Sequence, residues 1–247
     1  MVTFLVTGGS RGIGKAIVLD AARAGHSVAF TYSTKQDCAR EVEAEAQSLS
    51  QGKKVKAYEL DVRSSARTDA VVEAICHDFD GVHVLVNNAG INRPNLAVSM
   101  SDAEWREVIE TNLTGAFYMV RAVLPQFLAN GGGSFIHVSS IASYGITGQV
   151  NYCAAKAGLL GLSRGLAKEY GHKNIRSNAL MLGLFDTDMV REGLSSSNRE
   201  FWLRYCPLRR FGDVREVSQM CVYLASEAAG FINGQELTLT GGLEHAT

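Results

Sequence analysis

The stretch that decides the fold is VTFLVTGGSRGIGKAIVLDAA, residues 2–22. An apolar run over 2–6 predicts a strand, and a helical pattern begins near residue 12. Between them lies TGGSRGIG, residues 7–14, whose glycines let the backbone turn sharply and approach a ligand closely. A glycine-rich loop alone is also compatible with an ordinary turn, but a strand before it and a helix after it favour a phosphate site. We therefore expect the pyrophosphate of a dinucleotide to contact Gly8, Ser10, Arg11, Gly12, Ile13 and Gly14.

The same alternation of short apolar runs and longer helical patterns continues along all 247 residues. We expect strands near 2–6, 27–32, 54–59, 82–87, 134–139, 175–181 and 236–240. We expect helices near 12–24, 36–50, 65–79, 101–129, 152–171 and 214–226. Such alternation implies right-handed crossovers and a parallel sheet covered on both faces. Because no linker, repeat or low-complexity tract divides the chain, the sequence predicts one α/β domain over 1–247, a doubly wound Rossmann fold with a seven-stranded parallel sheet.

Composition excludes several classes of function. The formal net charge is −1, so no basic field indicates nucleic acid or an anionic membrane surface as a partner. No apolar stretch approaches the roughly 20 residues of a membrane span, and the N-terminus lacks the features of a signal peptide. The 5 cysteines are odd in number and never spaced as C-x-x-C, which favours free thiols over disulfides or metal ligands. We expect a cytoplasmic protein with no metal site.

The end of the second predicted strand bears on the choice of nucleotide. A carboxylate there would bind the ribose 2′-hydroxyl of NAD, but the sequence TYSTK at 31–35 places Ser33, Thr34 and Lys35 at this point. Together with Arg11 of the glycine-rich loop, these hydroxyls and cations suit a 2′-phosphate. The alternative is that Arg11 and Lys35 are ordinary solvated charges. The sequence favours NADPH or NADP as the cofactor.

A tyrosine and a lysine lie four residues apart in NYCAAKAG, residues 151–158. On a helix, Tyr152 and Lys156 would share one face about one turn apart, among small side chains. A free tyrosine has a pKa of about 10, and a cation nearby stabilises the phenolate and lowers that pKa. Such a pair is suited to proton transfer, whereas a lone surface pair would have no function.

Taken together, these motifs resemble the short-chain dehydrogenase/reductase family along nearly the whole chain. They are Thr7-Gly8-x-x-x-Gly12-x-Gly14, Asp61-Val62, NNAG at 87–90, Asn112 in TNLTG, the serines of HVSSIA, and Tyr152-x-x-x-Lys156. Within the family, GQVNYCAAKAG, PLRRFGDVREV and FINGQELTLTGG look most like the β-ketoacyl-carrier-protein reductases.

The resemblance implies a role for each matching residue. Asp61 and Val62 would flank the adenine, and the cofactor would be lined by Asn88, Ala89 and Gly90. Tyr152 would be the general acid in reduction, and Lys156 would tune it and hold the nicotinamide ribose. Asn112 would anchor a water that links Lys156 to solvent.

The family's serine can be placed in two ways. Counting thirteen residues back from the tyrosine gives Ser139, whereas aligning the strand in GSFIHVSSIA gives Ser140. We choose Ser140, because strand length fixes where a side chain emerges and alternation sends Ser139 to the opposite face. Ser139 is the fallback.

A second departure from the family follows the sixth predicted strand, where Leu182 replaces a common proline. Gly183 remains and would meet the nicotinamide amide, with Thr187 near the pyrophosphate. The stretch 184–212 has no clean period, which is typical of a functional loop or helical flap. Its aromatic residues Phe201, Trp202 and Tyr205 either cover a substrate or close the core, while His137 is expected to be packed rather than catalytic.

The leading hypothesis is an NADPH-dependent ketoreductase that reduces a β-ketoacyl thioester on acyl carrier protein, in fatty-acid or polyketide-type synthesis. A dehydrogenase of a free small alcohol, sugar or steroid shares the same catalytic residues, and a dinucleotide-binding regulator would not require them. An acidic carrier would find cations at Lys173, Arg176, Arg209 and Arg210, although each alone is more simply explained as a solvated surface charge. Small residues along 152–166 suit close helix contacts, and the resemblance implies a homotetramer with 222 symmetry.

Overall fold

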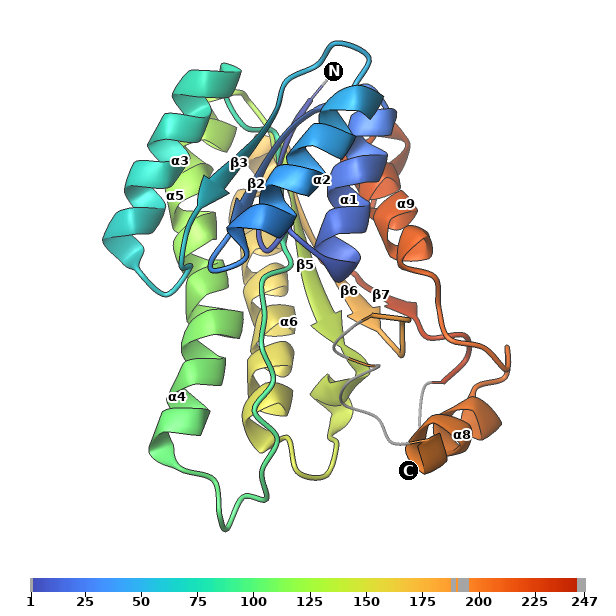
Figure 1. Ribbon diagram of the computed structural model, residues 1–247. Helices are drawn as coiled ribbons and strands as arrows, with labels where there is room; N and C mark the ends of the chain where they lie inside the picture. The colour runs from blue at the N-terminus through green and yellow to red at the C-terminus, as the bar shows by residue number, and fades with distance from the viewer. Residues whose placement is uncertain (1, 188–189, 191–195, 244–247) are drawn as a thin grey trace.

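The computed structural model describes residues 2–187, 190 and 196–243 (Figure 1). Within these residues, seven strands form one sheet in the order β3-β2-β1-β4-β5-β6-β7, and all neighbouring strands are parallel. The strands are β1 (Thr3–Val6), β2 (Ser27–Tyr32), β3 (Val55–Glu59), β4 (Val84–Asn87), β5 (Gly133–Ser140), β6 (Ile175–Leu182) and β7 (Glu236–Leu239). The predicted doubly wound fold with a seven-stranded parallel sheet is confirmed.

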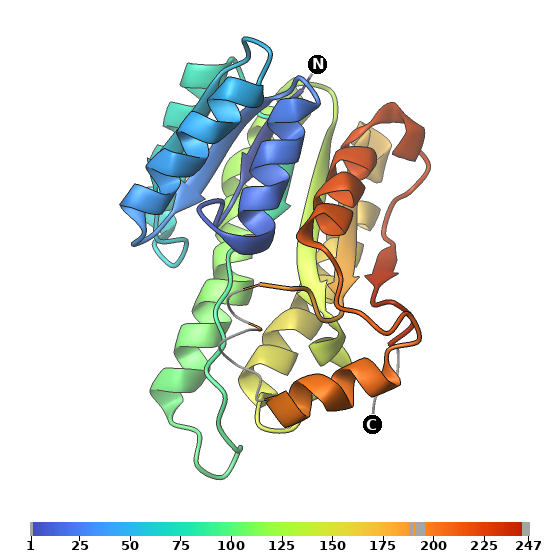
Figure 2. The ribbon, with the colours of Figure 1, turned by 45° about the vertical axis from the view of Figure 1, so that its right-hand side comes forward.

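Helices cover both faces of this sheet (Figures 1 and 2). The α-helices are α1 (Gly12–Arg23), α2 (Gln36–Leu49), α3 (Ser65–Phe79), α4 (Asp102–Ile109), α5 (Gly115–Ala129), α6 (Val150–Tyr170), α8 (Ser196–Tyr205) and α9 (Val214–Ala225). One core cluster joins α1, α2 and α9 to the sheet, and a second joins α3, α5 and α6. Short 3-10 turns η2 (Ile141–Tyr144), η3 (Gly171–Lys173) and η4 (Glu227–Ala229) connect these elements.

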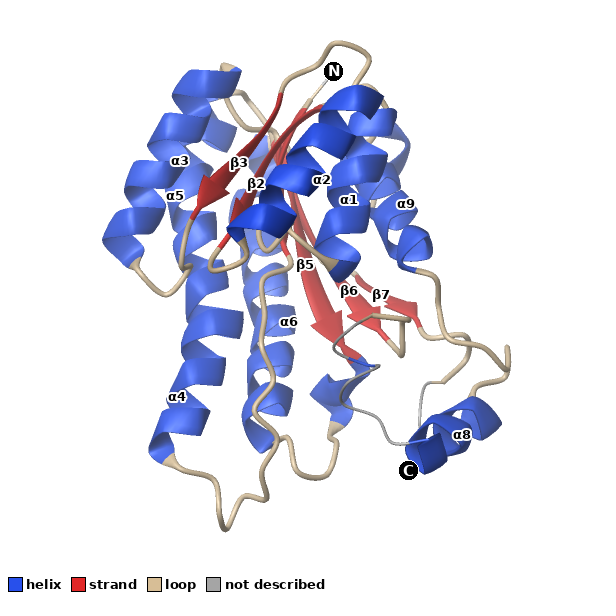
Figure 3. Ribbon diagram, viewed as in Figure 1, coloured by secondary structure: helices blue, strands red, loops and turns tan. Residues whose placement is uncertain are grey.

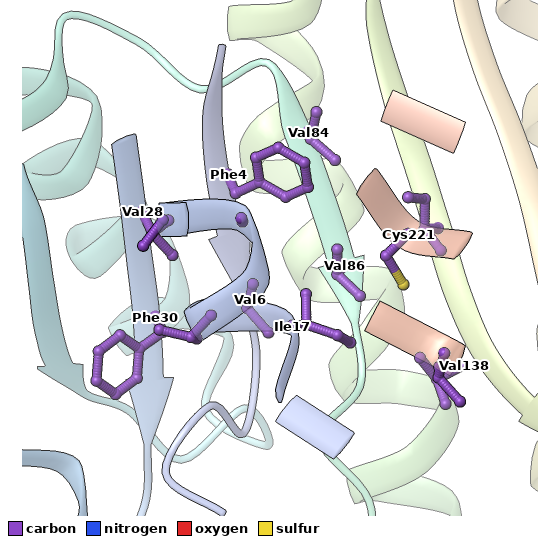
Figure 4. Close-up of a cluster of buried hydrophobic side chains, with 14 of the residues drawn as sticks. Phe4, Val6, Ile17, Val28, Phe30, Val84, Val86, Val138 and Cys221 are labelled. Atoms are coloured by element: carbon purple, nitrogen blue, oxygen red, sulfur yellow. The ribbon is translucent and has the colours of Figure 1, made fainter. Parts of the chain in front are cut away.

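Successive residues of the central strands point into different clusters. Phe4 and Val6 of β1 belong to the cluster under α1 and α9, which is drawn in Figure 4, whereas Leu5 belongs to the other cluster. All three side chains are fully buried. A strand that is covered on both faces needs apolar residues at every position, and this explains why the strands are continuous apolar runs in the sequence.

The predicted helix over 101–129 is interrupted in the structure. A π-helical turn at Glu110–Thr114 separates α4 from α5, and the Gly115 N–H bonds the Glu110 carbonyl. The wider turn lies where Asn112 is buried and where Gly115 packs so closely on Val62 that a Cβ there would lie 2.7 Å from its Cγ2 atom. Tertiary contacts of this kind override the helical pattern.

The strand order reverses between β1 and β4, and all strands end at the same edge of the sheet (Figure 3). In open α/β sheets, ligands bind outside the carboxyl ends of the strands at such a reversal. The five cysteines carry free thiols, and no group of three or more metal-ligating side chains occurs among the described residues. None of the helices in the described part of the chain is long and apolar enough to cross a bilayer.

A chain of polar groups crosses the core beneath this edge. His137 on β5 is fully buried, and its Nδ1 accepts a bond from the Asn87 amide at 3.3 Å. Its other ring nitrogen therefore carries the proton and bonds Ser177 at 3.2 Å, which in turn bonds Ser163 at 3.0 Å. Burial lowers the pKa of His137 to about 4, so the imidazole is neutral.

We predict that this histidine makes the fold sensitive to acid. Between pH 6.5 and about 4 the unfolded chain binds a proton that the folded imidazole rejects, so the free energy of unfolding falls as pH falls. The contribution is about 1.4 kcal/mol per pH unit within this window. Urea unfolding of His137→Gln between pH 4.5 and 7.5 should show a shallower slope than wild type. The exposed His77→Gln is the control, and equal slopes for His137→Gln and wild type would contradict the prediction.

Candidate active site

A cavity of about 490 Å³ opens at the carboxyl edge of the sheet. Residues that follow β1, β2, β3, β4 and β6 contribute to its lining, and so do the last three residues of β5. The lining includes every residue predicted to bind the cofactor, namely Gly8, Ser10, Arg11, Gly12, Ile13, Gly14, Ser33, Asp61, Val62, Asn88, Ala89, Gly90, Tyr152, Lys156, Gly183 and Thr187. It also includes Ser140, whereas Asn112 is buried outside the lining.

The glycine-rich loop at the start of α1 has the shape that a pyrophosphate requires. Gly8 and Gly12 have φ angles of +68° and +54°, which favour glycine. A Cβ on Gly14 would lie 2.1 Å from the Gly8 carbonyl oxygen, so this position admits no side chain. Arg11 is the N-cap residue of α1 and its side chain makes no capping bond. The N-terminal N–H groups of α1 therefore face an open cradle that fits a phosphate group.

Four hydrogen bonds join this loop to the loop after β4. The Thr7 hydroxyl accepts from the N–H groups of Asn88 and Ala89, both at 3.0 Å. The Asn88 amide donates to the carbonyls of Thr7 and Gly8, at 2.9 and 3.2 Å. Thr7 is part of the glycine motif but was not predicted as a site residue; its place between the β1 strand and the first glycine is the signal that could have indicated it.

The end of the cavity beside β2 carries hydroxyls and cations. Ser33, Thr34 and Lys35 are exposed, and they line the cavity together with Arg11. Asp61 also lies here, but Arg63 grips its carboxylate at 2.6 Å and holds the pKa of Asp61 below its usual range. No acidic residue follows β2 in the lining, which is the feature that separates a 2′-phosphate site from a 2′-hydroxyl site.

The two serines at the end of β5 have different partners. The Ser140 hydroxyl lies close enough to the Tyr152 phenol to lower its pKa, and it accepts the Ala142 N–H at 3.1 Å. The Ser139 hydroxyl is buried and donates to the Lys156 carbonyl at 2.9 Å. Strand alternation has therefore sent the two hydroxyls in different directions, and Ser140 is the one that meets Tyr152.

Burial has the largest effect on the pKa of Tyr152 in this structure. Burial raises the pKa of Tyr152 to about 12, although the Ser140 hydroxyl opposes the rise. The Lys156 ammonium lies 5.5 Å from the centre of the tyrosine ring and donates to the Val138 carbonyl at 2.7 Å. It is directed at that carbonyl, and burial lowers the pKa of Lys156 to about 8. Burial of the phenol thus raises its pKa more than the Ser140 hydroxyl lowers it.

The side chain of Asn112 forms hydrogen bonds with the main chain of Ile91. Its side chain accepts the Ile91 N–H at 2.8 Å and donates to the Ile91 carbonyl at 2.9 Å. A Cβ on the preceding Gly90 would lie 3.3 Å from the Asn112 Oδ1 and 3.6 Å from the Lys156 Nζ. Asn112 and Lys156 thus lie close to the same glycine.

The segment after β6 closes the remaining side of the cavity. The ring of Phe185 packs on Gly212, where a Cβ would lie 2.3 Å from it, and the Gly183 N–H bonds the Leu239 carbonyl. Leu182, in the place of the family's proline, is the buried last residue of β6. Parts of the predicted flap, 188–189 and 191–195, lie outside the described residues.

The described part of the flap forms α8 beyond the strand ends (Figure 1). Phe201 and Tyr205 are 42% and 50% exposed, and their rings lie 4.7 Å apart. These two aromatic residues therefore do not close the core.

The four cations expected to receive a carrier protein do not form one patch. Arg176 donates to the carbonyls of Leu224 and Ile232, and Arg210 pairs with Glu216 at 2.6 Å. Lys173 precedes β6 at the amino edge of the sheet, whereas Arg209 follows α8 at the carboxyl edge. The fold thus separates these four residues, which were considered for carrier binding only because of their positive charge.

Comparison with known proteins agrees with this geometry. A family model described as enoyl-(acyl carrier protein) reductase, within the short-chain dehydrogenases/reductases, matches residues 8–244. The chain belongs to the short-chain dehydrogenase/reductase family. Members of this family are oxidoreductases that act on CH–OH groups, and the relatives imply a nicotinamide cofactor.

Relatives and solved structures in the family cover nearly the whole chain. A 3-oxoacyl-(acyl-carrier-protein) reductase of Staphylococcus epidermidis is 37% identical over 97% of each chain. The solved structure of a levodione reductase has a TM-score of 0.95 at 28% identity, covering 100% of this chain and 98% of that one. A short-chain dehydrogenase/reductase of Serratia marcescens, solved as a double mutant, has a TM-score of 0.92 at 29% identity, covering 99% and 98%.

We predict that the two serines contribute differently to turnover. Ser140→Ala removes the hydroxyl that meets Tyr152 and should lower kcat by about 100-fold or more. Ser139→Ala removes a bond to the Lys156 carbonyl and should cost about 1 kcal/mol of stability, with kcat within a few-fold of wild type. Steady-state rates and urea unfolding of both variants check this. A larger loss of kcat in Ser139→Ala would show that the fallback assignment was right.

Proposed function

We propose that the protein is an NADPH-dependent ketoreductase that reduces β-ketoacyl thioesters on acyl carrier protein to 3-hydroxyacyl products. The observation that carries this proposal is the hydroxyl pair of Tyr152 and Ser140 on the wall of the nucleotide-shaped cavity. Two O–H groups that converge can both donate to one carbonyl oxygen. A 3-oxoacyl-(acyl-carrier-protein) reductase is 37% identical to this protein over 97% of the chain, and this similarity supports the class of substrate.

Cofactor residues are proposed from the same cavity. The α1 N-terminus and the loop of Gly8, Gly12 and Gly14 would hold the pyrophosphate, because only residues without Cβ atoms leave this cradle open. Asp61 and Val62 would lie beside the adenine, and Gly183 and Thr187 beside the nicotinamide half. When bound, the nicotinamide supplies the electron pair that reduces the carbonyl carbon.

Tyr152 would then complete the reduction by protonating the substrate oxygen. A pKa of about 12 keeps the phenol protonated at neutral pH, so the acid is always loaded, and a forming alkoxide is a stronger base that takes its proton. Ser140 would donate to the same oxygen and stabilise its developing charge. Lys156, whose ammonium lies beside the tyrosine ring, would hold the nicotinamide ribose and favour the phenolate left behind, with Asn112 serving its proton supply.

The preference for NADPH rests on the residues after β2. We predict that the ratio of kcat/KM for NADPH to that for NADH is at least about 10, because Arg11 and Lys35 attract the extra phosphate. Ser33→Asp should reverse the order, since a carboxylate repels the phosphate and accepts the ribose hydroxyls. Ser48→Asp, which adds the same charge on α2 outside the lining, is the control. Equal turnover of wild type with both cofactors would refute the preference.

A second candidate function is reduction of a free ketone. The solved levodione reductase, whose name states such a substrate, has a TM-score of 0.95 with this chain. The catalytic residues are common to both functions, so the flap must decide between them. Exposed side chains of the described flap include Arg199, Arg204 and Arg209, a basic set that suits an acidic carrier better than a neutral ketone.

Turnover assays separate the two candidates. We predict a higher kcat/KM for a β-ketoacyl group on acyl carrier protein than for the same group on N-acetylcysteamine. Salt should reduce this advantage, because it weakens the attraction between exposed charges on the two proteins. At 0.1–0.15 M ionic strength, charges more than about 8–10 Å apart are largely screened. A free ketone that outperforms both thioesters, with a ratio unaffected by salt, would favour the second candidate.

A homotetramer is proposed from the surface. Large apolar side chains are exposed on α5, at Phe117 and Leu128, and beside α9, at Tyr223 and Phe231. Two separate apolar faces of this kind suit the two different two-fold contacts of a 222 tetramer.

A further inference from the structure

Asn151 lies at the start of α6, directly before Tyr152, and its side chain is fully buried. A buried amide must find partners or cost stability. The N-cap residue of this helix, Gln149, makes no side-chain capping bond, so the first N–H groups of α6 depend on other partners.

The amide of Asn151 connects three segments of the chain. Its Oδ1 accepts the main-chain N–H of Tyr152 at 2.7 Å. Its Nδ2 donates to the carbonyl of Arg93 at 3.0 Å and to that of Glu104 in α4 at 3.3 Å. One side chain thus ties the backbone of Tyr152 to the loop after β4 and to α4.

The loop after β4 reaches this clamp from the cofactor cavity. Its first residues, Asn88 to Gly90, line the cavity, and Asn112 grips Ile91 through both main-chain groups. Two residues later Asn151 holds Arg93, and the Asn95 N–H then bonds the Gly148 carbonyl at 2.8 Å. Residues 88–95 form a strap that runs from the cavity wall to the start of the helix that carries Tyr152.

We propose that Asn151 is a positioning residue that holds Tyr152 in reach of Ser140 by fastening the first turn of α6 to this strap. The inference rests on the proposed role of Tyr152 as the acid. Tyr152 and Ser140 line the same cavity but come from different elements, α6 and β5, so the approach of their hydroxyls depends on where α6 begins. Catalytic groups must be held within about 0.5 Å of the productive geometry, a tolerance that a loosened first turn would exceed.

The experiment compares three variants of the full chain. Asn151→Ala removes all three bonds, and Asn151→Asp keeps the acceptor for the Tyr152 N–H but loses both donors to the strap. Asn178→Ala is the matched control, because Asn178 on β6 is equally buried, donates to the Ile232 carbonyl and accepts from Gln235, and lies outside the cavity lining.

The readouts are kcat from pH 6 to 9 with the carbonyl substrate that wild type reduces fastest, the Kd of NADPH, and the Tm. We expect both Asn151 variants to lose at least 10-fold in kcat at every pH, with a Kd within 3-fold of wild type. A displaced acid is poor even when protonated, so lower pH should not restore the rate. Asn178→Ala should lower the Tm comparably and keep kcat within 2-fold. Equal kcat losses in Asn151→Ala and Asn178→Ala, or a rate restored at low pH, would overturn the proposal.

A second measurement does not depend on turnover. The ¹³Cζ resonance of Tyr152, assigned by its loss in Tyr152→Phe, should shift or broaden in Asn151→Ala and remain unchanged in Asn178→Ala. If wild type reduces no carbonyl compound, the proposed function fails while this resonance still tests the clamp. An unchanged Tyr152 resonance in Asn151→Ala would overturn the positioning role itself.

Discussion

The site depends on the hydrogen bonds that join the loops after β1 and β4 where the strand order reverses. Thr7 and Asn88 make four bonds across this point, and Gly14 packs against the same carbonyl that Asn88 holds. Each such bond contributes only about 1 kcal/mol, but together they fix the phosphate loop relative to the strap of residues 88–95. These bonds therefore connect the two parts of the cavity. The glycine-rich loop lies on one side of them, and the strap leads to the start of α6 on the other.

Burial governs the chemistry of the proposed acid. Burial raises the pKa of Tyr152, which favours its protonated form, and lowers the pKa of Lys156. An acid with a high pKa is suited to protonating a strongly basic alkoxide, which is what reduction of a ketone produces. The reverse reaction requires the phenolate and so needs the cation of Lys156 more.

Much of the fold could be predicted because its signals are local. Strands buried on both faces are continuous apolar runs, and their predicted limits lie within two residues of the observed ones. Much of the cavity lining was also predictable, because many of its residues lie at or directly after the carboxyl end of a strand. The choice of Ser140 over Ser139 followed from strand alternation, and the structure gives only Ser140 the contact with Tyr152. Other features depend on contacts with particular partners. Asn112 in the π-helical turn bonds Ile91, and the Lys156 ammonium donates to the Val138 carbonyl. Arg176 bonds the Leu224 carbonyl, and Arg210 pairs with Glu216. No periodicity encodes such contacts.

The central claim is that the Tyr152 hydroxyl delivers the proton that completes carbonyl reduction. The most direct measurement is kcat of Tyr152→Phe at saturating NADPH and substrate, together with the Kd of NADPH, with Tyr118→Phe on α5, outside the cavity lining, as the control. We predict a loss of about 100-fold to 10,000-fold in kcat for Tyr152→Phe, an unchanged Kd, and a normal rate for the control. A Tyr152→Phe enzyme that turns over within a few-fold of wild type would contradict it.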